Sequence, residues 1–127
     1  MSTRQEIRTT DAPAPGGSYS QGIAVGNLVF TAGMVPVDPA TGKVAGDDVA
    51  AQTHQVMKNL AAVLAARGLS FADVVKTTVH LQDLQRDFRA FDEVYRSYLS
   101  EPYPVRTTVG STLNNVLVEI DLVAYQD

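Results

Sequence analysis

The chain has 127 residues and a formal net charge of −4. Its content of 45% hydrophobic and 19% charged residues is that of a folded globular protein, so wholesale disorder is excluded. The ten lysines and arginines are scattered, which argues against nucleic acid as a partner, and the lack of cysteine excludes disulfides and thiolate metal sites. With no run of 18 apolar residues and no secretory signal in the charged first ten residues, we expect no membrane association and a cytoplasmic protein.

The length predicts a single domain over residues 1–127. Its first third is expected to form short strands, beginning with an edge strand at residues 4–9. Gly26-Asn27 lies between apolar residues 23–25 and 28–30, a pattern typical of a hairpin with a two-residue turn. The segment 38–42, rich in turn-forming residues, is expected to end this unit in a further turn.

Two helices are expected next. Asp47 or Asp48 is placed to cap the first, and Gly68 is placed at its C-terminal end. Asp87 is expected to cap the second, which Pro102 ends. Apolar side chains at helical spacing form one stripe on each helix. These stripes are Val49, Thr53, Val56, Met57, Leu60, Val63 and Leu64 in the first helix and Phe88, Phe91, Tyr95, Tyr98 and Leu99 in the second.

Three more strands are expected, at residues 74–81, 106–109 and 118–125, the last two joined by a turn around Asn114-Asn115. In the strand at 74–81, alternation predicts that Val75, Thr77, Val79 and Leu81 share one face. The order of strands and helices is not a regular βαβ alternation. It predicts an α+β fold, with two helices packed on one face of a mostly antiparallel sheet.

The second face of this sheet is expected to be mixed in character. In the last strand Val118, Ile120, Leu122 and Ala124 should meet the helices. The opposite face would then carry Glu119, together with Arg106 and Lys76 from other strands. Such a face is either solvated or covered by another chain, and a charge buried there would need a partner.

Arg106 and Glu119 are the leading candidates for chemistry. The fork of Arg106 can bind a carboxylate through two parallel hydrogen bonds, although a structural salt bridge is the common role of such a residue. Glu119 is flanked by apolar residues and could act as a general acid or base, or simply occupy a half-exposed position. Tyr19 could line a pocket or pack. The two histidines lack metal-ligand spacing, so no metal is expected.

Five motifs along the chain match those of one family, in the same order. They are Tyr19-Ser20-Gln21-Gly22, Phe30-Thr31-Ala32-Gly33-Met34-Val35-Pro36 with Pro39-x-Thr41-Gly42, Val75-Lys76-Thr77-Thr78-Val79, Pro104-Val105-Arg106-Thr107-Thr108-Val109 and Val118-Glu119-Ile120-Asp121. Together they resemble the Rid/YjgF family of RidA-like reactive-intermediate deaminases, also called enamine/imine deaminases.

The resemblance implies a chorismate-mutase-like α+β fold and a homotrimer, in which three sheets form a central β-barrel with the helices outside. It implies active sites in the clefts between subunits. The reaction implied is hydrolysis of reactive 2-imino and enamine acids to 2-oxo acids and ammonia, without metal or cofactor, as in a 2-iminobutanoate/2-iminopropanoate deaminase.

Five residues match positions with a role in that family. Arg106 matches the arginine that holds the substrate carboxylate. The main chain of Thr108 matches the position that orients the attacking water, and Glu119 matches the glutamate that positions this water or relays a proton. Tyr19 matches a pocket tyrosine from the neighbouring subunit, and the backbone of Gly33 matches a position that borders the pocket.

The chain also departs from the family pattern. Asp92 stands where an asparagine is common near the site, and the added anion would either disfavour an anionic substrate or pair with Arg106. Met34 replaces a frequent glutamine, and Leu113-Asn114 replaces a Leu-Pro turn. Two other functions stay open: a specialised catabolic deaminase or hydrolase of the same family, and a non-catalytic module that binds a 2-imino or 2-oxo carboxylate.

Overall fold

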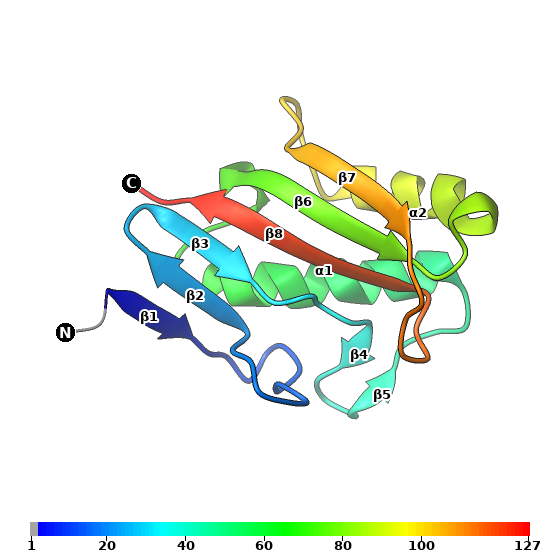
Figure 1. The fold of residues 1–127 in the computed structure, drawn as a ribbon, viewed down its shortest axis with the longest axis horizontal. Coiled ribbons are helices and arrows are strands. Elements are labelled where there is room, and N and C mark those ends of the chain that lie inside the picture. The colour runs from blue at the N-terminus through cyan, green and yellow to red at the C-terminus, as the bar shows by residue number, and fades with distance from the viewer. Residues whose placement is uncertain (1–2) are drawn as a thin grey trace.

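The computed structural model describes residues 3–127, which form a six-stranded mixed sheet with two α-helices on one of its faces (Figure 1). The α+β architecture expected from the order of elements is therefore confirmed. The elements are β1 (Arg4–Ile7), β2 (Gly22–Val25), β3 (Leu28–Thr31), β4 (Val37–Asp38), β5 (Lys43–Val44), α1 (Val49–Ala65), a 3-10 turn (Phe71–Asp73), β6 (Val74–Leu81), α2 (Leu84–Ser97), β7 (Val105–Gly110) and β8 (Val118–Tyr125).

The sheet has the strand order β1-β2-β3-β8-β6-β7, and β4 and β5 form a separate two-stranded hairpin. All neighbouring pairs in the large sheet are antiparallel except β6 and β7, which are parallel. Parallel strands require a crossover connection, and α2 supplies it. The last two strands are consequently not neighbours: β8 lies between β3 and β6, and β7 forms one edge of the sheet (Figure 1).

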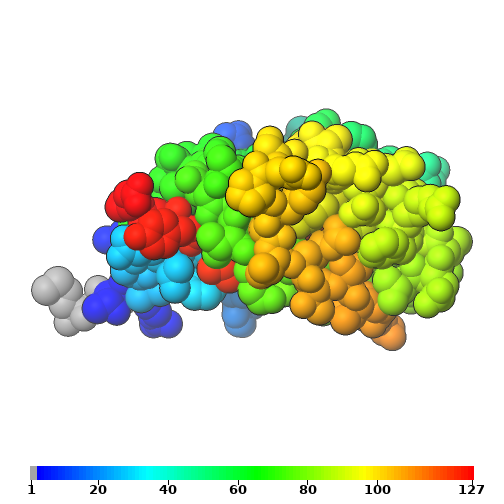
Figure 2. Space-filling view, turned by 90° about the horizontal axis from the view of Figure 1, so that it is seen from above, coloured from blue at the N-terminus to red at the C-terminus, as the bar shows by residue number. Residues whose placement is uncertain are grey.

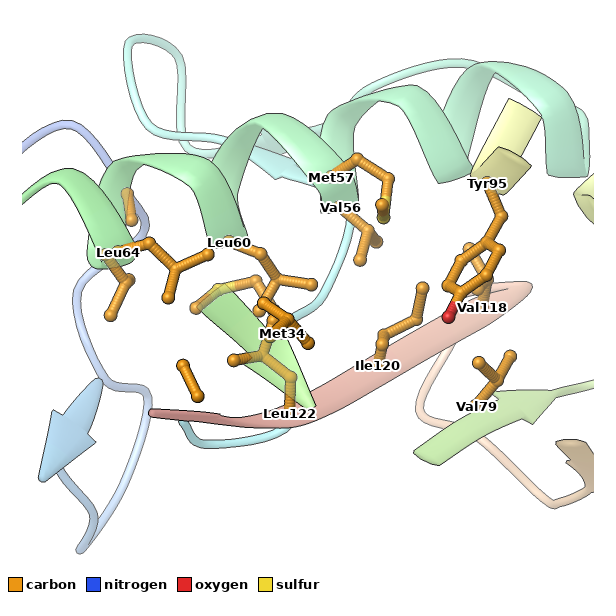
Figure 3. Close-up of a cluster of buried hydrophobic side chains, with 14 of the residues drawn as sticks. Met34, Val56, Met57, Leu60, Leu64, Val79, Tyr95, Val118, Ile120 and Leu122 are labelled. Carbon is orange, nitrogen blue, oxygen red and sulfur yellow. The ribbon is translucent and has the colours of Figure 1, made fainter. Parts of the chain in front are cut away.

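The hydrophobic core lies between the sheet and the helices (Figure 3). The alternation expected in β8 is confirmed, because Val118, Ile120, Leu122 and Ala124 are each at most 2% exposed. The stripe of α1 packs against them, with Val56, Leu60, Val63 and Leu64 fully buried. Burial of each such side chain contributes roughly 1.5–3 kcal/mol to the free energy of folding. This packing therefore determines which face of the sheet the helices cover.

Both ends of α1 are closed by hydrogen bonds. Of the two candidate caps, Asp48 is the N-cap, and its Oδ1 accepts a hydrogen bond from the amide of Ala51 at 2.8 Å. At the other end the amides of Gly68 and Leu69 donate to the carbonyls of Ala65 and Leu64, both at 2.9 Å. Gly68 has a φ of 75°, the left-handed conformation that this Schellman arrangement requires and that glycine adopts without strain.

The predicted start of α2 was one turn too late. Asp83, not Asp87, is the N-cap, and its carboxylate accepts from the amide of Arg86 at 3.1 Å. Asp87 lies within the first turn, where it is buried and accepts two hydrogen bonds from the guanidinium of Arg86 at 2.8 and 2.9 Å. An acidic residue is stabilised anywhere in the first turn by the helix dipole, so composition alone does not separate the two positions.

The predicted face of Val75 was also wrong. A register shift between Val74 and Lys76 in the pairing of β6 with β8 marks a β-bulge. A bulge adds one residue to one strand and shifts its alternation. Val74 is therefore buried, and Val75 is 46% exposed.

No element of residues 3–127 covers the second face of the sheet, which we call the open face (Figure 1). It carries exposed apolar side chains, among them Leu28, Phe30, Val105 and Tyr125. Its polar side chains come from the centre of the sheet, where His80 is paired in register with Glu119 and Thr78 with Asp121. Neither α-helix of the described chain has the length and apolarity that crossing a membrane would demand.

The capping of α1 gives a direct test. Asp48→Ala removes the acceptor for the Ala51 amide and is expected to lower the free energy of unfolding by about 1 kcal/mol. Asp47→Ala is the matched control, because it removes the same charge one residue earlier without removing the cap, and should change stability by less than about half as much. Urea denaturation of both variants makes the comparison. Equal losses would mean that charge near the helix end, not the cap, is what stabilises α1.

Candidate functional site

Arg106 lies on the helix-facing side of the sheet, contrary to the expectation that it shares a face with Glu119. In the parallel pairing of β7 with β6, Arg106 is in register with Thr77, which is buried beneath α2. Glu119 is in register with His80 on the same strand. Thr77 and His80 are three residues apart, and side chains an odd number of positions apart in a strand point to opposite faces. Within one chain the two candidate residues therefore do not meet.

The guanidinium of Arg106 is held by one carboxylate and three aromatic rings. Its Nη1 donates to Oδ1 of Asp92 at 2.6 Å, so the pairing considered for this aspartate is confirmed. Its Cζ lies 4.9 Å from the ring centroid of Tyr95 and 5.5 Å from those of Phe88 and Phe91. Cations are attracted to aromatic faces at such distances. With its side chain only 23% exposed, Arg106 is fixed in position before any ligand binds.

A cavity of about 460 Å³ opens beside this ion pair. It is lined by Asp92, Tyr95, Arg96, Tyr103, Pro104 and Arg106. Figure 2 shows α2, in yellow and yellow-green, on the same face of the molecule as β7, in orange. The volume is in the usual range for small-molecule sites. The cavity combines a fixed cation with aromatic walls, which suits a small carboxylate with an apolar or unsaturated body.

Tyr95 links the cavity to the core. Its hydroxyl lies 2.8 Å from Oγ1 of Thr77, a buried contact in which either oxygen can donate. Burial raises the pKa of the Tyr95 phenol above its ordinary value, and the hydrogen bond to Thr77 and the charge of Arg106 only partly offset this. The phenol is therefore neutral at physiological pH. It serves as a fixed wall of the cavity and not as a base.

Thr108 lies two residues beyond Arg106 and on the same face of β7, in register with Val79. The amide of Ser111 donates to the carbonyl of Leu81 at 2.9 Å. Alternation along this parallel ladder directs the main-chain groups of Arg106 and Thr108 away from β6, toward the free edge of the sheet. The main chain of Thr108 is thus placed where it can bind water or a ligand.

Glu119 and Gly33 are brought together on the open face. A bridge between Met34 and Ile120, with hydrogen bonds of 2.7 and 3.2 Å, holds the chain after β3 against β8. A Cβ atom on Gly33 would overlap Oε2 of Glu119 and lie 2.9 Å from its Cδ. Any side chain at this position would therefore displace the carboxylate. The sequence matched the backbone of Gly33 to a position that borders the pocket in the family. In this structure Gly33 lies against the side chain of Glu119.

Asp121 follows Glu119 on the same face. Burial raises the pKa of its carboxyl, and the nearby charges of His80 and Lys76 oppose the rise. His80 Nδ1 lies 2.7 Å from Oγ of Ser111, which connects β6 to the end of β7. Neither His80 nor Ser111 is marked by a motif in the sequence, because their contact, between residues 31 positions apart, depends on the register of two strands.

Tyr19 does not join either group. It lies in the loop before β2 and is 51% exposed, and its hydroxyl accepts a hydrogen bond from the amide of Gly16 at 2.9 Å. In the strand order, β2 is separated from β7 by β3, β8 and β6. Across residues 3–127, no three histidine, aspartate or glutamate side chains gather in a way that could hold a metal ion.

Comparisons with known proteins agree with this fold. A family model described as Endoribonuclease L-PSP matches residues 9–126. The chain belongs to this family, which is the Rid/YjgF family inferred from the motifs.

Individual relatives cover nearly the whole chain. A RutC family protein of Pyrococcus horikoshii is 43% identical over 126 residues, covering 98% of this chain and 99% of the relative. A 2-iminobutanoate/2-iminopropanoate deaminase of Salmonella typhimurium is 41% identical over 123 residues, covering 93% and 94%. The crystal structure of RidA from an Antarctic Psychrobacter superimposes with a TM-score of 0.90 at 41% identity, covering 95% of this chain and 98% of that one. The family thus includes proteins named as deaminases and others named only as RutC proteins.

The contact between Gly33 and Glu119 can be tested by a double-mutant cycle. Gly33→Ala is expected to destabilise the protein by up to about 1 kcal/mol, because the added methyl group displaces the flexible end of the Glu119 side chain. In a Glu119→Ala background the same substitution should cost much less, since its obstacle is gone. Urea denaturation of the wild type, both single variants and the double variant measures this coupling. Additive losses would show that something other than Glu119 limits the space at Gly33.

Proposed function

We propose that the protein hydrolyses reactive 2-imino and enamine acids to 2-oxo acids and ammonia. The observation that carries the proposal is the fixed guanidinium of Arg106 at the wall of a cavity of about 460 Å³, which is suited to a small carboxylate. The Salmonella relative, which is named as a deaminase of 2-iminobutanoate and 2-iminopropanoate, supports this choice of substrate.

In the proposed reaction Arg106 binds the substrate carboxylate and so orients the neighbouring C=N bond. Main-chain groups of Thr108 and the carboxylate of Glu119 position a water molecule, whose oxygen bonds to the imine carbon. One proton of this water passes to the nitrogen, by way of Glu119, as the C–O bond forms. The second passes from the new hydroxyl to the nitrogen as the carbonyl forms and the C–N bond breaks, and the products are a 2-oxo acid and ammonia. Positioning of this kind removes much of the entropic barrier to a reaction with water.

We further propose that the active site is completed between copies of the chain in a homotrimer with a central β-barrel. Arg106 and Glu119 lie on opposite faces of one sheet, so Glu119 and Gly33 of one copy would face Arg106 and Thr108 of the next. Tyr19 would likewise come from a neighbouring copy. The exposed apolar side chains of the open face, such as Phe30 at 40%, support association through this face.

An imine-trapping assay tests the activity. An amino-acid oxidase generates 2-imino acids in the presence of semicarbazide, and an active deaminase lowers semicarbazone formation. We expect the wild type to do so and Arg106→Ala to lose at least about 100-fold in rate, since the partly buried charged anchor of the substrate is removed. Arg8→Ala, which removes an arginine whose side chain is 77% exposed, is the matched control and should retain full activity.

Wild-type protein that is inactive on every imine would overturn the proposed reaction. If it still bound 2-oxo acids through Arg106, the non-catalytic carboxylate-binding function would replace it. Activity confined to an unusual imine would instead favour a specialised catabolic enzyme.

Sedimentation tests the assembly. Sedimentation equilibrium of the wild type is expected to give a molecular mass three times the chain mass of 13.6 kDa. Phe30→Asp places a charge on the open face and should release monomers, because burying an unpaired carboxylate is costly. Val44→Asp is the control, since Val44 is 42% exposed on the β4–β5 hairpin, away from that face. A monomeric wild type, or a trimer that Phe30→Asp leaves intact, would contradict association through the open face.

A further inference from the structure

The cation at the proposed site is already paired with an anion of the same chain. Asp92 and Arg106 are 32% and 23% exposed, and the carboxylate holds Nη1 of the guanidinium at 2.6 Å. Both residues line the cavity. Arg96 is the one other charged residue that lines the cavity within residues 3–127. Its side chain is exposed on the last turn of α2. A ligand at Arg106 therefore meets a carboxylate as well as a guanidinium.

This pairing penalises a simple anion. Asp92 already occupies Nη1 of Arg106. A ligand carboxylate that binds the other N–H groups of the same guanidinium must therefore lie next to the carboxylate of Asp92, and the two negative charges repel each other. Partial burial reduces the screening that water would supply. A ligand that carries a positive nitrogen beside its carboxylate avoids this penalty, because its cation offsets the charge of Asp92.

We propose that Asp92 is a specificity-determining residue, which makes the Arg106 site select ligands with a positively charged nitrogen adjacent to the carboxylate over carboxylates that lack one. The inference rests on the proposed function in one respect, the binding of the ligand carboxylate by Arg106. For the proposed reaction it has a direct consequence. The protonated imino acid carries such a nitrogen, whereas the 2-oxo acid does not, so Asp92 favours the substrate and hastens release of the product.

A purely structural role for Asp92 makes a different prediction. If Asp92 served only to hold the Arg106 side chain, the amide of an asparagine could keep the hydrogen bond through its oxygen. Ligand selectivity would then survive the substitution. If the negative charge is what selects, Asp92→Asn must change selectivity even while the fold and the position of Arg106 are preserved.

Glycine and glycolate are the probes for the experiment, because both are achiral and they differ only in an ammonium group against a hydroxyl group. Dissociation constants are measured at pH 7 by titration of backbone amide chemical shifts on the full-length protein. We expect the wild type to bind glycine more tightly than glycolate. Asp92→Asn should lower this preference by roughly tenfold or more, the effect of removing one partly buried charge contact, with tighter glycolate binding.

Two further variants separate the possible failures. Glu93→Gln neutralises the next residue of α2, which is exposed, and should leave the ratio of the two constants unchanged. Arg106→Gln should weaken both ligands. If Arg106→Gln weakens both but Asp92→Asn leaves the ratio unaltered, the inference about Asp92 is overturned and the carboxylate site stands. If Arg106→Gln alters neither, both the carboxylate site and the inference fail.

Discussion

The parallel pairing of β6 with β7 is the constraint on which the site depends. It requires a crossover, and the crossover is α2, which packs against β6 and contacts Arg106 of β7 through its aromatic side chains. The same pairing sets Arg106 opposite Thr77 and so turns the arginine toward the helix. It also leaves β7 at the sheet edge, with main-chain groups free to bind.

The ion pair beneath α2 has an energetic cost that the aromatic rings reduce. Removing two charges from water is unfavourable, and their attraction alone often does not compensate. Here both side chains keep partial contact with solvent, and three rings lie around the guanidinium. The stripe of α2 thus has two roles. Phe91 and Tyr95 are buried in the core, whereas Phe88 stays 40% exposed and lies over Arg106 at the surface.

Much of the fold could be predicted from local sequence, and much of the site could not. The alternation in β8, the cap at Asp48 and the turn at Gly26 depend on neighbouring residues, so they are visible in the sequence. The face of Arg106 depends on which strand β7 joins, and the exposure of Val75 depends on a bulge set by the partner strand. The motifs mark the candidate site residues, and pairing of Asp92 with Arg106 was one of two alternatives that the sequence left open. The contact of Gly33 with Glu119, and the separation of Glu119 from Arg106, required the three-dimensional pairing.

The division of these residues between two faces fits the proposal that copies of so short a chain complete one site together. A sheet covered on one side buries a core of modest size and leaves little room for an enclosed pocket. Arg106 lies at the boundary between α2 and the edge of the sheet, and Glu119 lies on the open face. On the proposed arrangement, a second copy supplies the missing wall and shields the ion pair, the glutamate and the reacting water from bulk solvent. Association would then couple to ligand binding by mass action, since a ligand held between copies stabilises the assembled state over separate chains.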